Sequence, residues 1–135
     1  ADINLSNVTI KNLDTEGRLL AVLGNDASHG WGTAGANGAN VTMTTQNQTL
    51  EGAIEVDTIS TLNLTLGKGS NFTGTIKIVD NADGGKAVAD NAVVTVEEGA
   101  TWNLTGDVTL TSLTNKGTIN FNGHTITLAD GTVLK

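Results

Sequence analysis

Short runs that alternate between hydrophobic and polar residues dominate the chain from residue 41 onward. Each run is rich in Val, Ile, Leu and Thr and is bounded by Gly, Asn or Asp. Because successive side chains of a β-strand point to opposite faces, this period predicts short strands with one apolar and one polar face. The predicted strands cover residues 41–44, 53–56, 62–66, 75–78, 94–96, 108–110, 118–121 and 125–128.

An internal repeat contains several of these strands. The segment LTLGKGSNFTGTIKI, which begins at Leu64, aligns with VTVEEGATWNLTGDVTL, which begins at Val94. Both copies contain a strand, a glycine corner, an aromatic residue, a Thr-Gly corner and a second strand, in that order. Phe72 and Trp102 occupy the same place in the two copies, 102 − 72 = 30 residues apart. A repeat of this kind is typical of stacked architectures.

The short strands and frequent corners favour an all-β fold of the parallel β-helix (solenoid) type. Like side chains of successive turns would then stack at the strand spacing of about 4.8 Å, and Asn and Thr could form ladders. Phe72 would lie on Trp102 as an inward pair, so we predict both as structural core residues. A β-sandwich is the alternative, because Asn122–Gly123 is a dipeptide that favours a hairpin between antiparallel strands.

Residues 1–40 have a weaker pattern, and we expect an irregular N-terminal capping segment there. Within it, Ile3, Leu5, Val8 and Ile10 indicate one or two strands, and residues 18–23 indicate a strand or a short helix. The repeats would fill residues 41–135, and the whole chain of 135 residues would form one domain. The stretch GNDASHGWGTAGANGAN, residues 24–40, predicts a long loop, and long loops in compact domains are often functional. His29 and Trp31 are the candidate ligand contact, because an exposed Trp beside glycine can stack on a sugar ring. Alternatively, Trp31 folds back over the open end of the coil.

Composition narrows the classes of function. The formal net charge is −7 and basic residues are scattered, so we expect neither nucleic-acid binding nor attraction to anionic lipid. Cysteine is absent, which excludes disulfides and thiolate metal sites. Because no apolar run is long enough to span a bilayer, membrane insertion is not expected either.

Residues with catalytic or metal-binding potential do not form a convincing pattern. Arg18 is the single arginine, and the two histidines, His29 and His124, are far apart in the sequence. A solvated sheet surface accounts for the acidic residues that could share one strand face, which are Glu55, Asp57 and Asp107. The stretch DNADGG, residues 80–85, lacks the alternating ligands of a calcium loop and predicts a plain turn. We therefore expect no enzyme activity, no cofactor and no metal site.

Three stretches in order, GWGTAGANGAN, QTLEGAIEVDTISTLNLTL and TWNLTGDVTLTSLTNKGTINFNG, resemble repeats of large bacterial surface adhesins. These adhesins are β-solenoid proteins and include autotransporter passengers. The resemblance covers most of the chain from residue 30 to 134. It implies a right-handed parallel β-helix that is secreted to the bacterial cell surface and has a structural or adhesive role without catalysis.

The ends of a short solenoid lead to a second hypothesis. Its terminal strands have backbone groups that no neighbouring strand pairs. We expect a final short strand near residues 132–134 as well, and no obvious polar cap follows it. The chain could therefore be a subunit of an extracellular filament, assembled by end-to-end stacking or strand donation. A polysaccharide-binding module is a third hypothesis. The expected partners are a second copy, another surface protein or a glycan.

Overall fold

The computed structural model describes residues 1–135, with the exception of the His29 side chain. The described chain is all-β, and its one helical element is the short 3-10 helix η1 (Ala27–His29). The strands are β1 (Asp2–Ser6), β2 (Arg18–Val22), β3 (Asn40–Gln46), β4 (Thr49–Asp57), β5 (Thr61–Leu66), β6 (Asn71–Val79), β7 (Ala92–Val96), β8 (Thr101–Leu104), β9 (Val108–Leu110), β10 (Ser112–Asn115), β11 (Thr118–Asn120), β12 (Ile126–Leu128) and β13 (Val133–Leu134).

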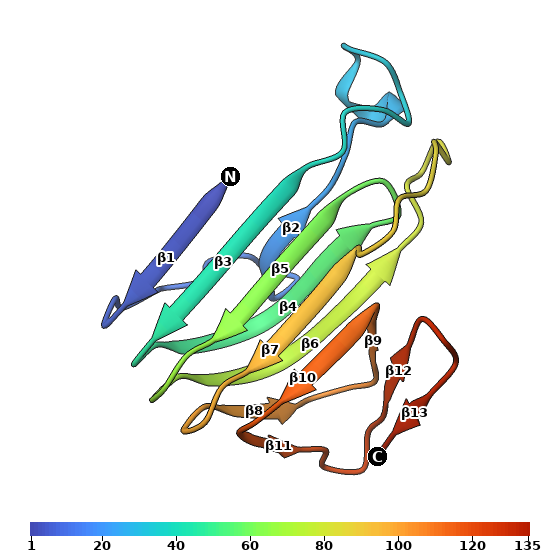
Figure 1. The fold of residues 1–135 in the computed structure, drawn as a ribbon. Helices are drawn as coiled ribbons and strands as arrows, with labels where there is room; N and C mark the ends of the chain where they lie inside the picture. The colour runs from blue at the N-terminus through green and yellow to red at the C-terminus, as the bar shows by residue number, and fades with distance from the viewer.

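The strands form three sheets (Figure 1). Sheet 1 has the order β1-β3-β5-β7-β10, sheet 2 has the order β11-β8-β6-β4-β2, and sheet 3 has the order β13-β12-β9. The chain passes from sheet 1 to sheet 2 and back. Each new strand therefore lies beside the preceding strand of its own sheet and runs in the same direction. Every pair in sheets 1 and 2 is therefore parallel, and only β12 and β13 pair antiparallel. The predicted all-β class is confirmed, and its main sheets are parallel.

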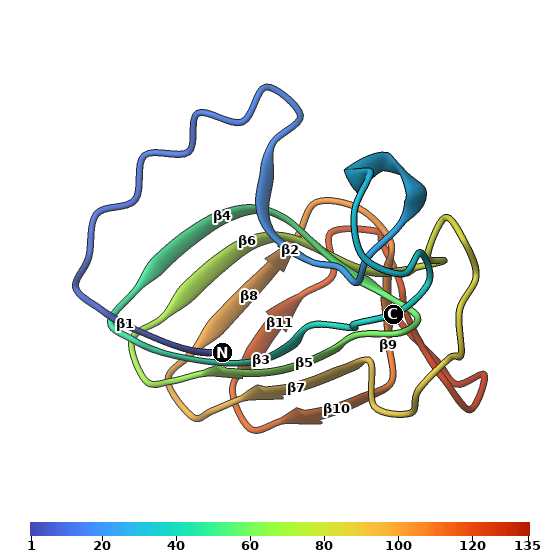
Figure 2. The ribbon, with the colours of Figure 1, turned by 90° about the horizontal axis from the view of Figure 1, so that it is seen from above.

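Sheets 1 and 2 face each other across the hydrophobic core (Figure 2). Alternate residues of the strands point inward, and the inward set is almost entirely aliphatic because the chain has only two Phe, two Trp and no Tyr. The largest fully buried side chains are Trp102, Phe72, Leu50, Ile54, Leu62, Leu64, Leu66, Ile76, Leu104, Leu110 and Ile126, together with the polar Gln48.

Like residues lie above one another in the core. Phe72 pairs in register with Trp102, and their rings stack with centroids 5.6 Å apart and planes 16° from parallel. Both side chains have an exposed fraction of 0%. The indole N–H of Trp102 donates to the Gly74 carbonyl at 3.1 Å, so the one polar group of this buried side chain has a partner. This is the arrangement that the alignment of the two repeat copies predicts.

The corner that leads from sheet 1 to sheet 2 depends on a left-handed backbone. Asn47, Gly69 and Gly99 occupy this corner in successive turns, with φ of 46°, 79° and 85°. Glycine and asparagine are the residues for which this conformation costs least. The corners also bond to one another, because the Asn47 N–H donates to the Lys68 carbonyl and the Gly69 N–H to the Gly99 carbonyl.

Asparagine side chains form a ladder on the outer face of sheet 2. The Asn103 amide donates to the Asn71 oxygen at 2.9 Å, and the Asn120 amide donates to the Asn103 oxygen at 2.7 Å. The ladder therefore runs through three successive strands, β6, β8 and β11.

Two sequence expectations need correction. The segment of residues 1–40 is less irregular than expected: the strands indicated at the start of the chain and near residues 18–23 are present as β1 and β2, which pair in register with β3 and β4 and extend both main sheets. Asn122–Gly123 forms a tight turn, in which the His124 N–H donates to the Phe121 carbonyl at 2.9 Å, but it does not make a hairpin. The flanking strands β11 and β12 pair with β8 and β9 of different sheets, so the dipeptide turns a corner instead.

Candidate functional site

The loop of residues 23–39 carries the predicted ligand contact. Asp26 caps η1 by accepting from the Ser28 N–H at 2.8 Å, and Gly30 ends it in the left-handed region. Trp31 follows with an exposed fraction of 72%. The prediction that it covers the open end of the coil is wrong, because a side chain this exposed shields little of the interior. The His29 side chain lies outside the described part of the chain.

A buried junction at the end of β4 holds this loop against a second one, residues 80–91. Asp57 has an exposed fraction of 2%, and its Oδ2 accepts from the Gly24 N–H at 2.8 Å and from Asn81 Nδ2 at 2.9 Å. Asn81 Nδ2 also reaches the Asn25 carbonyl at 3.2 Å. Asp57 thus links two loops from successive turns. Within the described chain, Asp57 Oδ1 and Asn25 Oδ1 are buried without a hydrogen-bond partner.

Asp57 is a residue that sequence reasoning placed wrongly. We expected it on a solvated strand face, but the loops that follow β2 and β6 cover it. Its strand position alone gives no signal for this burial, because both loops come from distant parts of the sequence.

The stretch of residues 80–85 forms an Asx turn. Asn81 Oδ1 accepts from the Asp83 N–H at 3.0 Å, and the Gly84 N–H donates to the Asn81 carbonyl at 2.9 Å. The Asp83 carboxylate accepts from the Ala27 N–H at 2.6 Å and so joins this turn to η1. Among the described residues, no group of three or more His, Asp or Glu side chains could hold a metal ion.

A groove of about 770 Å³ lies at the other end of β4. One wall is the segment of residues 7–17, which arches away from the sheet between β1 and β2 (Figure 2). The opposite wall is the first part of β4, residues 49–52. Val8 and Ile10 on the arch are 49% and 41% exposed, and Lys11 and Glu51 also line the groove. The groove therefore combines apolar and charged walls, and sequence reasoning did not identify it.

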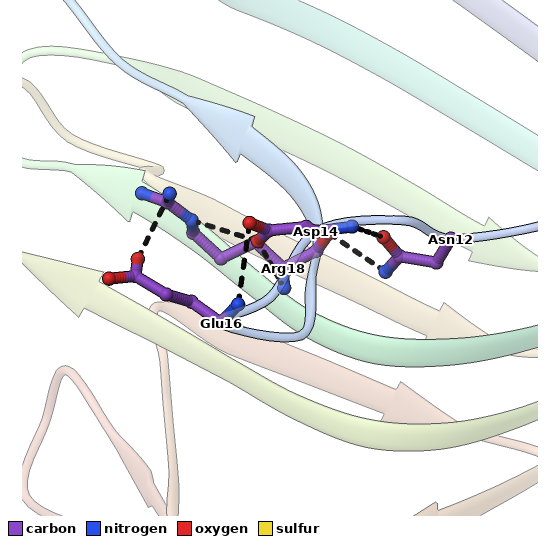
Figure 3. Close-up of polar contacts among 4 residues, drawn as sticks. All are labelled: Asn12, Asp14, Glu16 and Arg18. Carbon is purple, nitrogen blue, oxygen red and sulfur yellow. Dashed lines mark hydrogen bonds and ion pairs between the residues drawn. The ribbon is translucent and has the colours of Figure 1, made fainter.

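A hydrogen-bonded loop from Asn12 to Arg18 forms the far end of the arch (Figure 3). Asn12 Nδ2 donates to the Arg18 carbonyl, and the Asp14 N–H donates to Asn12 Oδ1, both at 2.9 Å. Asp14 Oδ2 accepts from the Arg18 N–H at 2.7 Å and from Arg18 Nε at 3.2 Å, while Glu16 lies 3.0 Å from the guanidinium. These bonds close the loop on itself.

The same contacts set the protonation of Asp14 and Arg18. The Arg18 backbone N–H, followed by its guanidinium, lowers the pKa of Asp14 below its usual value of 3.8. The hydrogen bond that the Arg18 guanidinium donates to the Asp14 carboxylate raises the pKa of Arg18. Both groups stay charged near neutral pH, so they are suited to holding the loop and unsuited to transferring a proton.

We expect the Arg18 amide signal in NMR spectra to titrate with a midpoint below pH 3.8. Because the pKa of Asp14 is lower in the folded than in the unfolded chain, its stabilisation of the loop is present above pH 3.8 and disappears as pH falls through the lowered pKa. Asp14→Asn should abolish the titration. A midpoint at or above 3.8 would contradict this assignment of the carboxylate's partner.

The remaining candidates lie apart. His124 Nδ1 is 3.7 Å from the Asp107 carboxylate on a surface of the last turns, whereas Arg18 pairs with acidic residues of the first turn. The structure therefore does not bring His124 and Arg18 into one site.

Comparison with known proteins found no match. No protein-family model matches the chain, and no curated protein and no solved structure is significantly similar to it. In the part of the chain that the structure describes, no helix has the length and apolarity needed to cross a bilayer.

Proposed function

We propose that the chain is a right-handed parallel β-helix that serves as a non-catalytic structural and adhesive segment of a secreted bacterial surface protein. The observation that carries this proposal is the stack of parallel strands with like side chains in columns, from the Phe72–Trp102 pair inside to the asparagine ladder outside. In such a stack each turn contacts only its neighbours, which is how solenoid proteins build extended surfaces.

The outer surface supports the same proposal. Thr, Asn, Glu and Lys side chains alternate with the core residues, and the net charge of −7 keeps such a surface soluble. The resemblance of the repeats to bacterial adhesins agrees with this role. Since no relative was found, the proposal depends on the architecture and that resemblance.

We expect beads coated with the protein to attach several-fold more than albumin-coated beads to at least one of a panel of immobilised polysaccharides, matrix proteins and epithelial cells. Trp31→Ala is the matched variant, because this side chain is exposed and its removal leaves the core intact. Attachment that persists in the Trp31→Ala variant supports an adhesive role of the solenoid body. Attachment at the albumin level on every surface contradicts that role.

Exposure of Trp31 favours the polysaccharide-binding module as a second candidate. An aromatic face in a glycine-rich loop can stack on a sugar ring, as in many carbohydrate contacts. In the same bead assay, this candidate requires attachment to polysaccharide alone and its loss in Trp31→Ala.

The sheet edges favour a third candidate, the filament subunit. Strand β1 ends sheet 1 on one side, and strand β10 ends it on the other. End-to-end stacking would pair these edges between copies. Donation of the last strand has less support, since β13 folds back onto β12. Concentration-dependent polymers in electron micrographs would support stacking, and a monomer at millimolar concentration would exclude it.

A further inference from the structure

Strand β4 has one edge that is only half covered. Its partner β6 pairs with it along its whole length, from Thr49 to Asp57. On the opposite edge, β2 pairs only with Ala53–Val56. The first residues of β4, Thr49 to Gly52, therefore lack a strand on this side, and the groove described above lies there.

The backbone of this uncovered part is directed into the groove. The Ala53 N–H donates to the Gly17 carbonyl at 2.9 Å, so Ala53 faces β2. In a parallel ladder alternate residues bond to opposite neighbours, so Glu51 and Thr49 face the same side as Ala53. No strand of the chain pairs with the N–H and C=O groups of Glu51. Such unpaired groups form a template for one further strand.

The arch opposite this edge is fixed at both ends. At one end the buried Gln48 side chain takes the place of a strand partner, accepting from the Val8 N–H at 3.0 Å and donating to the Val8 carbonyl at 2.6 Å. At the other end Asn12 bonds to Arg18, the first residue of β2 (Figure 3). Only Thr9, Ile10 and Lys11 lie between these two anchors. We call residues 9–11 the strap.

The register of the first turn fits the strap to the open edge. Strands β1 and β3 pair with an offset of 40 residues, since Ser6 lies opposite Gln46 and 46 − 6 = 40. Asn7 and Asn47 both have a left-handed backbone, with φ of 54° and 46°, so the corner keeps this offset. The same offset places Thr9, Ile10 and Lys11 opposite Thr49, Leu50 and Glu51.

The side chains at these positions are complementary. Leu50 begins a column of inward residues that continues through Phe72, Trp102 and Ile119, and Ile10 would add an aliphatic side chain to its end. Lys11 would lie beside Glu51, an opposite charge directly across the ladder. Pairing of the strap with β4 in this register would therefore bury Ile10, which is 41% exposed in the structure.

We propose that the uncovered edge of β4 is a strand-addition site and that its occupant is the strap of the same chain. The strap adds as a short parallel strand on Thr49–Glu51, and the groove is the open state of this site. Because Val8 and Asn12 tether the strap at both ends, its effective concentration at the edge exceeds that of any strand from a second copy. A ligand in the groove would hold the site open. This inference does not depend on the proposed surface role.

Cysteine cross-linking tests the closed state. The chain has no cysteine, so the double variant Lys11→Cys/Glu51→Cys carries the only two thiols. In the closed state their Cα atoms lie about 5 Å apart, within disulfide range. We expect near-complete formation of an intrachain disulfide under mild oxidation, seen as a mobility shift and an unchanged monomer mass. Circular dichroism confirms that the variant is folded.

The matched control is Thr9→Cys/Glu51→Cys, which is two residues out of register because Thr9 lies opposite Thr49 in the closed state. Its Cα atoms would lie about 8 Å apart in the closed state, too far for a disulfide. Cross-linking of the control at an equal rate would mean that the arch is only flexible, and would overturn the proposal. So would an interchain dimer, which identifies a second copy as the occupant, or the absence of any cross-link.

Amide hydrogen exchange tests closure in the unmodified protein. Slow exchange of the Glu51 amide that Ile10→Asp accelerates at least tenfold would support closure, and fast exchange in both proteins would contradict it.

Discussion

Replacement of Trp102 by alanine is expected to lower the free energy of unfolding by about 3–5 kcal/mol, the usual cost of removing a large buried aromatic side chain. Trp102 is fully buried and stacks on Phe72. The variant loses this contact, leaves a cavity between the sheets and removes the donor to the Gly74 carbonyl. Urea denaturation followed by circular dichroism measures the change in free energy.

Two comparisons show whether the stack itself contributes. Trp31→Ala removes the other tryptophan, which is 72% exposed, and should change the free energy of unfolding by less than about 0.5 kcal/mol. A double-mutant cycle between Phe72→Leu and Trp102→Leu should give a coupling of about 1 kcal/mol. Equal losses for the two tryptophan variants would contradict the burial of Trp102, and additive effects in the cycle would contradict the stack.

Asp57→Ala is expected to lower the free energy of unfolding by about 3 kcal/mol, because it removes the acceptor of two buried hydrogen bonds. The donors of these bonds are the Gly24 N–H and Asn81 Nδ2, which belong to the two long loops at the end of β4. We expect both loops to become accessible to protease in the variant while the strands stay protected. Denaturant titration and limited proteolysis measure these two effects.

Asp57→Asn separates the role of the accepting oxygen from that of the charge. Its amide keeps an oxygen for the Gly24 N–H and Asn81, and its NH₂ group replaces the oxygen that lacks a partner. We therefore expect a loss below about 1 kcal/mol. A loss equal to that of Asp57→Ala would mean that the negative charge stabilises the junction, contrary to our interpretation.

Much of the architecture could be predicted from local pattern. The alternation of apolar and polar residues gave most of the strands from β3 onward, because the face that a strand buries is a property of neighbouring residues. The repeat alignment predicted that Phe72 and Trp102 occupy equivalent places, and the structure stacks their rings. The groove and the strap could not be predicted, since the pattern of residues 7–17 does not reveal how far β2 extends along β4.

The sequence by itself determined that this chain forms short strands with an aliphatic interior, because strand period, corner residues and the lack of cysteine are all local properties. Only the tertiary structure decided which strands pair and what covers them. It placed Asp57 under two distant loops, turned Asn122–Gly123 into a corner between sheets and paired β1 and β2 with β3 and β4. The physical reason is that burial and pairing of these residues depend on segments 17–40 positions away, since 118 − 101 = 17 and 42 − 2 = 40, which no local pattern specifies.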